Sequence, residues 1–291
     1  MENNIDIVEK MKLLTTKYTP EYLAELEKKC YEDDREYPEN FSNWYPCIKD
    51  FGNFKHAEII SNQIFTFEEV HKMQETERID DVDWKEWYEI LRPTIEKMER
   101  RTWYSIKNGC YSNKFDFETS INKSKLDLPK NLFKINYNST MYDTGGYTEL
   151  VVREYIPYDP DHTITIYNGM PLRTEVRVFY NMDTKEIEYI EDYWNYDYCS
   201  KHINKLNDKL LFDLFHNKSN ISLTDHSKEL NKVMKFIEEN INTLKIEGLK
   251  GVWSIDFMYD RDLNSTYLID MARGFRSAYW NPNKLKNEIK T

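Results

Sequence analysis

The most constraining stretch of this sequence is 252–272, which reads VWSIDFMYDRDLNSTYLIDMA. Two runs of residues that favour strands flank a polar turn, and each run holds one aspartate. A hairpin loop at 261–265 would place Asp256 directly opposite Asp270, where two like charges destabilise the pair. A cation between the carboxylates removes that conflict, whereas a register slip of one residue puts them on opposite faces.

The composition indicates an acidic globular protein. Hydrophobic residues are 40% and aromatic residues 15% of 291 positions, which is enough for one to three domains with large cores. The net charge of −11 argues against broad contact with nucleic acid or anionic membrane. We expect no membrane span and no signal peptide. Four scattered cysteines predict neither a zinc site nor a disulfide framework, which favours a cytoplasmic location.

Periodicity predicts a helix-rich first third followed by a mixed α+β body. Helices are expected at 5–37, at 67–101 with a break near Pro93, at 200–216 and at 225–244. Besides the hairpin, short strands are expected at 103–107, 132–137, 148–156, 173–181 and 186–194. The polar stretch 118–131 is predicted to be a loop.

The predicted strand RTEVRVFY, residues 173–180, alternates in character. Arg173, Glu175 and Arg177 share one face, and the apolar face should pack on helices. The charged face is either solvated, as is normal for an antiparallel sheet, or it lines a site. Two arginines beside a glutamate suit a phosphate pocket, because arginine offers a fork of donors that the glutamate can orient.

Two further segments hold candidate binding residues. Lys107 and Lys114 flank a small-residue loop in WYSIKNGCYSNKFDF, and both could reach phosphates or lie exposed on a hairpin. The strand ELVVREYIP ends at Pro157, which marks a strand end or a hinge. The sequence lacks a P-loop, a dinucleotide fingerprint, a nucleophile elbow and a kinase catalytic loop.

The order of these segments resembles that of the ATP-grasp superfamily. It runs from a loop between two lysines, through an Arg-Glu-aromatic-Ile strand and an Arg-Glu-x-Arg strand, to two strands with one aspartate each. The resemblance covers roughly 103–275, and is greatest to the phage and bacterial branch of predicted peptide or amide ligases. The chain is also similar to the eukaryotic cell-division-cycle ATP-grasp assembly factor. The resemblance implies an α+β fold in which two subdomains clasp ATP, after a helix-rich N-terminal region.

The implied boundaries are 1–102 for the helix-rich N-terminal region, 103–155 for the N-terminal subdomain and 156–291 for the C-terminal subdomain with the metal-binding hairpin. The resemblance also implies a role for each matching residue. The expected ATP-binding residues are Lys107, Lys114, Arg153, Glu154, Tyr155, Ile156 and Glu175. The expected catalytic residues are Arg177, Arg173 and Lys114, and the expected Mg²⁺ ligands are Asp256 and Asp270.

The implied cofactors are ATP and Mg²⁺, and the implied reaction joins a carboxylate to an amine. An acyl-phosphate would form, with release of ADP and phosphate, on small-molecule or peptide substrates. The family usually has asparagine two residues after the second acid, where this chain has Ala272. This departure favours the alternative of a non-catalytic ATP-binding chaperone or assembly factor, with the N-terminal region as a protein-binding surface. A third interpretation is a structural module whose charged strand faces are only solvated.

The sequence does not identify the substrate. The loop YDPDHTITIYNGMPL holds Asp159, Asp161 and His162, any of which could contact the ribose or the substrate.

Overall fold

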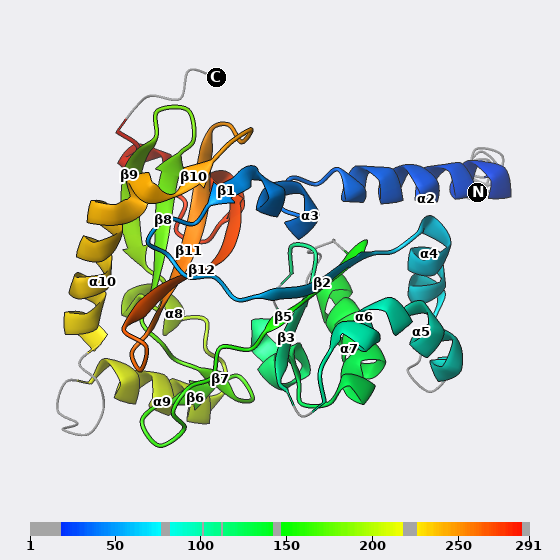
Figure 1. Ribbon diagram of the computed structural model, residues 1–291, viewed down its shortest axis with the longest axis horizontal. Coiled ribbons are helices and arrows are strands. Elements are labelled where there is room, and N and C mark those ends of the chain that lie inside the picture. Colours follow the sequence, from blue (N-terminus) through cyan, green and yellow to red (C-terminus); the bar gives the residue numbers. More distant parts are fainter. Residues whose placement is uncertain are drawn as a thin grey trace, which may run out of the picture.

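A computed structural model describes residues 19–76, 82–100, 102–111, 113–141, 147–217 and 226–286. Two four-stranded antiparallel sheets dominate it, each covered by helices, so the fold is mixed α+β as predicted (Figure 1). The sheets belong to two lobes that lie side by side. No described helix combines the length and apolar character needed to cross a bilayer.

The first lobe is built on a sheet of strand order β2-β5-β3-β4. Its strands are β2 (Ile59–Ile64), β3 (Tyr104–Asn108), β4 (Ile121–Asn122) and β5 (Glu149–Glu154). Its helices are α4 (Phe67–Glu75), α5 (Trp84–Ile90), α6 (Arg92–Lys97) and α7 (Leu128–Met141). Trp87, Leu91 and Leu132 are fully buried in the core between these helices and the sheet.

The second lobe is built on a sheet of strand order β12-β11-β8-β9. Its strands are β8 (Glu175–Asn181), β9 (Glu186–Asp192), β11 (Val252–Asp260) and β12 (Ser265–Arg273). Helix α10 (His226–Asn240) covers the sheet, and Val176 and Val178 of β8 share a core with Val233 and Ile237 of the helix. The prediction that the apolar face of β8 packs on a helix is therefore confirmed.

A smaller core adjoins the second lobe. It lies under α8 (Tyr196–Cys199) and α9 (Leu206–His216), next to the short ribbon of β6 (Thr165–Ile166) and β7 (Met170–Pro171). Short turns of 3₁₀ helix connect several of these elements. They are η1 (Tyr45–Cys47), η3 (Lys114–Ser120), η4 (Lys125–Asp127), η5 (Ile241–Thr243), η6 (Gly274–Arg276) and η7 (Pro282–Lys284).

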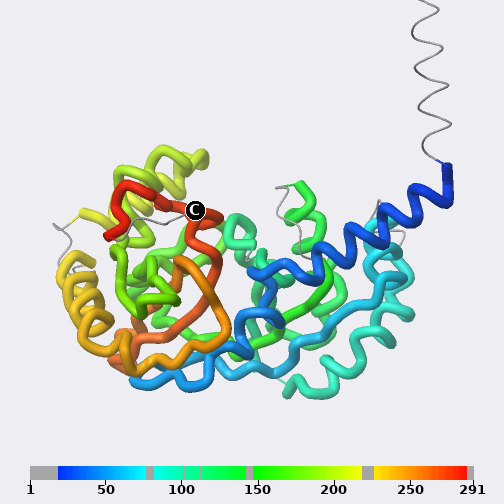
Figure 2. Tube along the Cα trace, turned by 90° about the horizontal axis from the view of Figure 1, so that it is seen from above, coloured from blue at the N-terminus to red at the C-terminus, as the bar shows by residue number. Residues whose placement is uncertain are grey.

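The first hundred residues contribute more than helices. Helix α2 (Pro20–Arg35) begins at Thr19, whose hydroxyl accepts a hydrogen bond from the Tyr22 amide, and α3 (Phe41–Trp44) follows. Strand β1 (Ile48–Asp50) then pairs with β10 (Lys245–Ile246), and β2 becomes an edge of the first-lobe sheet. The sequence predicted a helix-rich region before residue 103 with no strand in it, so β1 and β2 are a correction to that prediction. Helix α2 projects as an arm beside the first lobe (Figure 2).

Two local predictions are wrong, and two are confirmed where the structure describes them. The expected strand at 132–137 lies inside α7, whose buried residues Leu128, Leu132 and Ile135 follow helical spacing over a longer window. The expected loop at 118–131 contains β4, which pairs with β3, and the start of α7. The predicted break near Pro93 is present, because α5 ends at Ile90 and a new helix begins at Arg92. The expected helix over 5–37 is confirmed for α2, and its first part lies outside the described residues.

Candidate functional site

A cavity of about 160 Å³ lies between the two lobes. One wall comes from the first-lobe sheet and includes Lys107 of β3 and Arg153 of β5. The facing wall comes from the second-lobe sheet and includes Glu175 of β8, Asp256 of β11 and Asp270 of β12. The segment after β5 crosses from one lobe to the other and closes one side of the cavity.

The structure brings the predicted site residues together. Those that line the cavity are Lys107, Lys114, Arg153, Glu154, Tyr155, Ile156, Arg173, Glu175, Asp256 and Asp270. Arg177 is the one predicted residue outside this lining, and it is bonded to Asp256. Residues picked from four separate segments thus converge on one place, while their roles toward a nucleotide stay predictions.

The hairpin register places Asp256 opposite Asp270, as predicted, although the turn differs from the expected one. The predicted loop paired Asp260 with Thr266. In the structure the loop is one residue shorter, and Asp260 pairs with Ser265. If the ladder continued regularly from that pair, Asp256 would not lie opposite Asp270.

A β-bulge restores the alignment. Phe257 pairs with Leu268, the next pair is Asp256 with Asp270, and Ile269 is the extra residue between them. Regular pairing would set Asp256 against Ile269 and turn Asp270 toward the other face of the sheet. Bulges re-aim side chains in this way and are frequent beside functional sites.

Asp256 is neutralised by its cross-strand neighbour on β8, Arg177. The guanidinium donates from Nε to Oδ1 and from Nη2 to Oδ2, both at 2.7 Å, and both side chains are about nine-tenths buried. Burial by itself lowers the pKa of Arg177, but the charge and hydrogen bonds of Asp256 outweigh it and raise that pKa. Arg177 therefore stays charged at every accessible pH.

Asp270 is neutralised from the other lobe. The Lys107 ammonium donates to its two carboxylate oxygens at 2.9 and 3.0 Å. Burial favours a higher pKa for Asp270, but the Lys107 charge and hydrogen bonds prevail and lower it. The expected conflict between Asp256 and Asp270 is thus resolved by two basic side chains of the protein, one for each carboxylate.

Arg153 also spans the two lobes. Its Nε donates to the Ser105 hydroxyl at 3.2 Å within the first-lobe sheet, and its Nη1 donates to the Ile269 carbonyl at 2.6 Å. That carbonyl belongs to the bulged residue of β12, so Arg153 binds the irregularity that aligns the aspartates. Burial lowers the pKa of Arg153, and the nearby Asp270 acts in the opposite direction.

Arg173, just before β8, bonds to the crossing segment rather than to the aspartates. Its Nη2 donates to the carbonyls of Ile156 and Pro157 at 2.6 and 2.9 Å. The guanidinium also lies 5.8 Å from the centre of the Tyr158 ring, within the range of a cation–π contact. In this structure Arg173 therefore holds the backbone of the predicted hinge, and its contact with a phosphate stays a prediction.

Tyr193 is a cavity residue that the sequence reasoning missed. Its hydroxyl accepts a hydrogen bond from Lys114 Nζ at 2.7 Å, and its ring lies 4.8 Å from the Arg177 guanidinium. It directly follows β9, inside the predicted strand 186–194, but an aromatic residue at a strand end has no motif to identify it. It holds Lys114 and Arg177 beside each other despite their like charges.

Glu175 is a further acidic residue of the cavity, besides Glu154, Asp256 and Asp270. Burial, and then the charge of Asp256, raise its pKa to about 7. Its side chain is buried on the same face of β8 as Arg173 and Arg177. The predicted contact in which it orients an arginine is replaced by those arginines' bonds to the hinge carbonyls and to Asp256.

The acidic pair fits a Mg²⁺ ion that takes most of its ligands from phosphates and water. Among the described residues, no group of three or more His, Cys, Asp or Glu side chains is arranged to hold a metal. Mg²⁺ commonly uses only one or two carboxylates, and a carboxylate has about four acceptor positions. Asp256 uses two of these for Arg177 and keeps capacity for a cation. Asp270 accepts from Lys107 and from the Met271 amide, so a cation at Asp270 would take the place of Lys107.

Comparison with known proteins adds a likeness of architecture only. No protein-family model and no curated protein matches the chain. A C-terminally truncated Cdc123 from Schizosaccharomyces pombe aligns with a TM-score of 0.49 and 14% identity, over 87% of this chain and 92% of that chain. Another Cdc123 structure from the same organism aligns with a TM-score of 0.42 and 16% identity, over 83% and 86% of the two chains. TM-scores below 0.5 assign neither family nor activity to this chain.

Proposed function

We propose that the cavity between the lobes binds ATP with Mg²⁺, in an ATP-grasp-like arrangement, and that the chain acts as a nucleotide-dependent binding protein. One observation supports this most strongly. Basic side chains from the first lobe and an aligned pair of aspartates from the second face the same cavity. A triphosphate with its metal requires both basic and acidic groups, and both kinds line this cavity.

Each part of the cavity suits one part of the ligand. Lys107 and Lys114 would bind the phosphates, since both ammonium groups lie at the cavity wall. The backbone of 154–156 would face the adenine, and Asp256 with Asp270 would hold Mg²⁺ between them and the phosphates. The metal would supply charge neutralisation at the phosphates.

Nucleotide entry requires the lobes to separate. The cavity is about 160 Å³, below the roughly 300–1,000 Å³ of pockets for ligands of drug size. Opening breaks the Lys107–Asp270 ion pair, which joins the lobes. Lys107 can then exchange a carboxylate for a phosphate, and Asp270 becomes free for the metal. The closed arrangement thus already holds, within the protein, the charge pairs that a metal–nucleotide would replace.

Two features favour binding over catalysis. The position two residues after Asp270 is Ala272, so that side chain supplies no oxygen to a metal. Helix α2 has no buried residue, and it offers an arm that a protein partner could contact. Tyr22, Leu23 and Leu26 are each about two-fifths exposed on this helix. We propose that nucleotide binding and partner binding occur on the same chain.

Ligation is the second candidate function, and the group of Lys114, Tyr193 and Arg177 favours it. Two cations lie together beside Asp256, where they would stabilise charge on a transferred phosphoryl group. A carboxylate oxygen would attack the γ-phosphorus with release of ADP. An amine nitrogen would then displace phosphate to form the amide. ADP release that depends on an added carboxylate and amine would establish this reaction, and its absence with ATP bound would leave the binding role.

The first test of the nucleotide site is protein stability with and without ATP and Mg²⁺. A ligand that binds only the folded chain adds about 2.7 kcal/mol at one hundred times its Kd. We expect a Mg²⁺-dependent increase in wild type that is lost in Asp256→Asn and in Asp270→Asn. The matched control is Asp183→Asn, in the turn after β8, which should respond like wild type.

The opposite result is equally clear. If millimolar ATP with Mg²⁺ leaves the free energy of unfolding of the wild type unchanged, the cavity is not a nucleotide site. An increase that persists in both aspartate variants would show that ATP binds elsewhere.

A further inference from the structure

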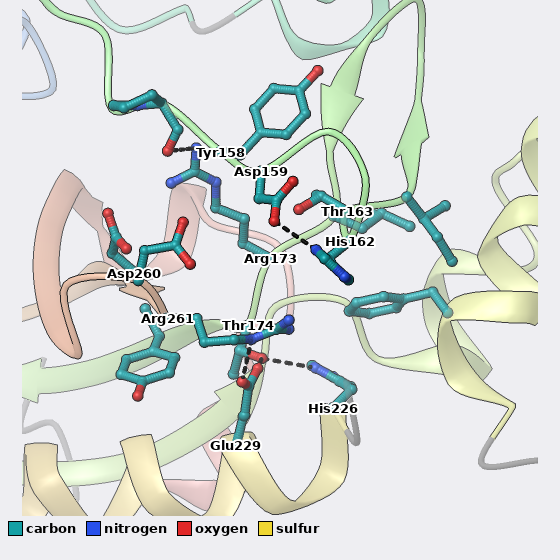
Figure 3. Close-up of a pocket in the computed structure, with 16 residues that line it drawn as sticks. Tyr158, Asp159, His162, Thr163, Arg173, Thr174, His226, Glu229, Asp260 and Arg261 are labelled. Carbon is teal, nitrogen blue, oxygen red and sulfur yellow. Dashed lines mark hydrogen bonds and ion pairs between the residues drawn. The ribbon is translucent and has the colours of Figure 1, made fainter. Parts of the chain in front are cut away.

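A second cavity, of about 240 Å³, lies beyond Arg173 and outside the proposed nucleotide site (Figure 3). It forms where the segment 157–164 and the start of β8 meet the ends of α9 and α10 and the β11–β12 turn. Of the predicted site residues, only Arg173 lines both cavities. The second cavity is therefore a separate feature of the fold.

Several polar groups around this cavity satisfy one another. The Thr174 hydroxyl donates to Glu229 Oε2 at 2.9 Å and lies 3.2 Å from His226 Nδ1. Glu229 Oε1 accepts from Arg261 Nε at 2.8 Å (Figure 3). These contacts tie α10 to β8 and to the hairpin turn, and they form a fixed polar floor with little capacity for a ligand.

Arg173 and Asp260 differ from these groups. The β8–β11 ladder pairs Arg177 with Asp256, and the Tyr259 amide donates to the Thr174 carbonyl at 2.8 Å. Continued by one step, this register sets Arg173 opposite Asp260. Opposite charges in that position normally pair. Between these two described residues, however, there is no ion pair.

Each of the two charges has capacity left. Arg173 gives its Nη2 to the hinge carbonyls, and its Nε is buried without a hydrogen-bond partner. Asp260 accepts from the Leu263 amide at 3.0 Å through Oδ1, a bond internal to the turn. The two residues are 9% and 6% exposed, so water compensates them poorly. Buried charges with unused hydrogen-bonding groups are costly unless something pairs with them.

We propose that this cavity binds a small zwitterion with one ammonium and one carboxylate group, the chemistry of a free α-amino acid. The ammonium would pair with Asp260, and the carboxylate would pair with the Arg173 guanidinium, since both residues line the cavity. The volume is below that of pockets for drug-sized ligands, which suits a compound of this size. Tyr158, Phe215 and Tyr259 line the same cavity and would cover its side chain.

The test is calorimetric titration of the full chain with single free amino acids, beginning with glycine, leucine, lysine and glutamate. The tightest ligand is then repeated as its N-acetyl form and as its amide. We expect each modified form to bind about tenfold more weakly or worse, because each loses a hydrogen-bonded charge. Asp260→Asn should weaken binding by a similar factor. The asparagine oxygen can still accept from the Leu263 amide, so the turn is kept.

Two controls separate this proposal from the nucleotide site. Asp161→Asn changes an acid of the segment 157–164 whose side chain does not line the cavity. This variant should bind the amino acid like wild type. Asp256→Asn should also bind the amino acid normally, even where it abolishes ATP binding. The proposal is overturned if no free amino acid binds at millimolar concentration. It is also overturned if the N-acetyl form binds wild type as tightly as the free amino acid does. The same holds if Asp260→Asn binds the free amino acid as tightly as wild type does.

Discussion

At the scale of single residues, the charged side chains of the main cavity interact electrostatically with one another. Arg177 donates two hydrogen bonds to Asp256, and burial followed by the charge of Asp256 raises the pKa of Glu175. Lys107 likewise donates two hydrogen bonds to Asp270. Four of these side chains are almost fully buried, so removing one charge leaves another without compensation.

Arg177→Met should destabilise the fold strongly, because Asp256 then stays buried without its partner. Breaking a buried ion pair costs about 3–5 kcal/mol, whereas replacing both partners by apolar residues is often neutral. Chemical denaturation should therefore show a large loss for the single variant and recovery of most of it in Arg177→Met with Asp256→Leu. A loss below about 1 kcal/mol in the single variant would mean that the pair is effectively solvated.

Glu175 should make stability depend on pH. Its pKa is raised from an ordinary value of 4.5 to about 7 in the folded chain, so the folded state holds a proton that the unfolded state has lost between those values. Stability from this group is complete below about 4.5 and is lost as the pH rises through about 7. Denaturation of wild type and Glu175→Gln across this range should show the variant gaining on wild type as the pH rises. Parallel profiles would contradict a raised pKa.

At the scale of elements, the site depends on the register of the hairpin strands and on the contacts that hold β12 and α10 in place. The bulge at Ile269 corrects the register of β12, and Arg153 fixes that bulge from the other lobe. Helix α10 is fastened to β8 mainly by apolar packing, with Thr174 as its polar connection to His226 and Glu229. The same connection forms the floor of the second cavity.

Thr174→Val should weaken the attachment of α10 and lower the free energy of unfolding, because valine keeps the side-chain shape but lacks the hydroxyl. The hydroxyl serves buried His226 and partly buried Glu229, and leaving a buried polar group unsatisfied costs about 1–3 kcal/mol. The matched control is Thr184→Val, in the exposed turn between β8 and β9, where we expect a change within about 0.5 kcal/mol. Equal effects of the two substitutions in urea denaturation would argue against a fastening role for Thr174.

At the scale of the whole molecule, the two lobes meet through polar contacts at the main cavity and through apolar packing, because Val151 of β5 is buried within the core of the second lobe. Lys107 with Asp270 and Arg153 with the Ile269 carbonyl both join the first lobe to β12. Polar contacts of this kind are easily exchanged for contacts with a ligand, unlike a packed apolar interface. In the proposed function, separation of the lobes is the motion that would admit a nucleotide to the main cavity.

Lys107→Met should make that separation more frequent. We expect faster hydrogen–deuterium exchange in β3 and β12, which face each other across the cavity, and no change in α10. Lys130→Met replaces an exposed lysine of the same lobe and should exchange like wild type. Slower or unchanged exchange in both strands of Lys107→Met would mean that this ion pair does not hold the lobes together.

The sequence by itself determined the segments of the site, because strand alternation and residue order act over short distances. The charged face of β8, the lysines around the loop after β3, and the aspartate in each hairpin strand were all predicted. It also placed Asp256 opposite Asp270, although the predicted turn was wrong and the unforeseen bulge at Ile269 compensated for it. A bulge leaves no local signature in a run such as YLIDMA.

Only the tertiary structure decided which charges pair. Lys107 meets Asp270, Arg153 meets Ile269, and Arg173 turns to the hinge carbonyls rather than to Asp260. These partners are more than a hundred residues apart in the first two cases, so no periodic pattern relates them. The structure likewise turned the expected strand at 132–137 into part of α7, since burial against the first-lobe sheet outweighs local β propensity.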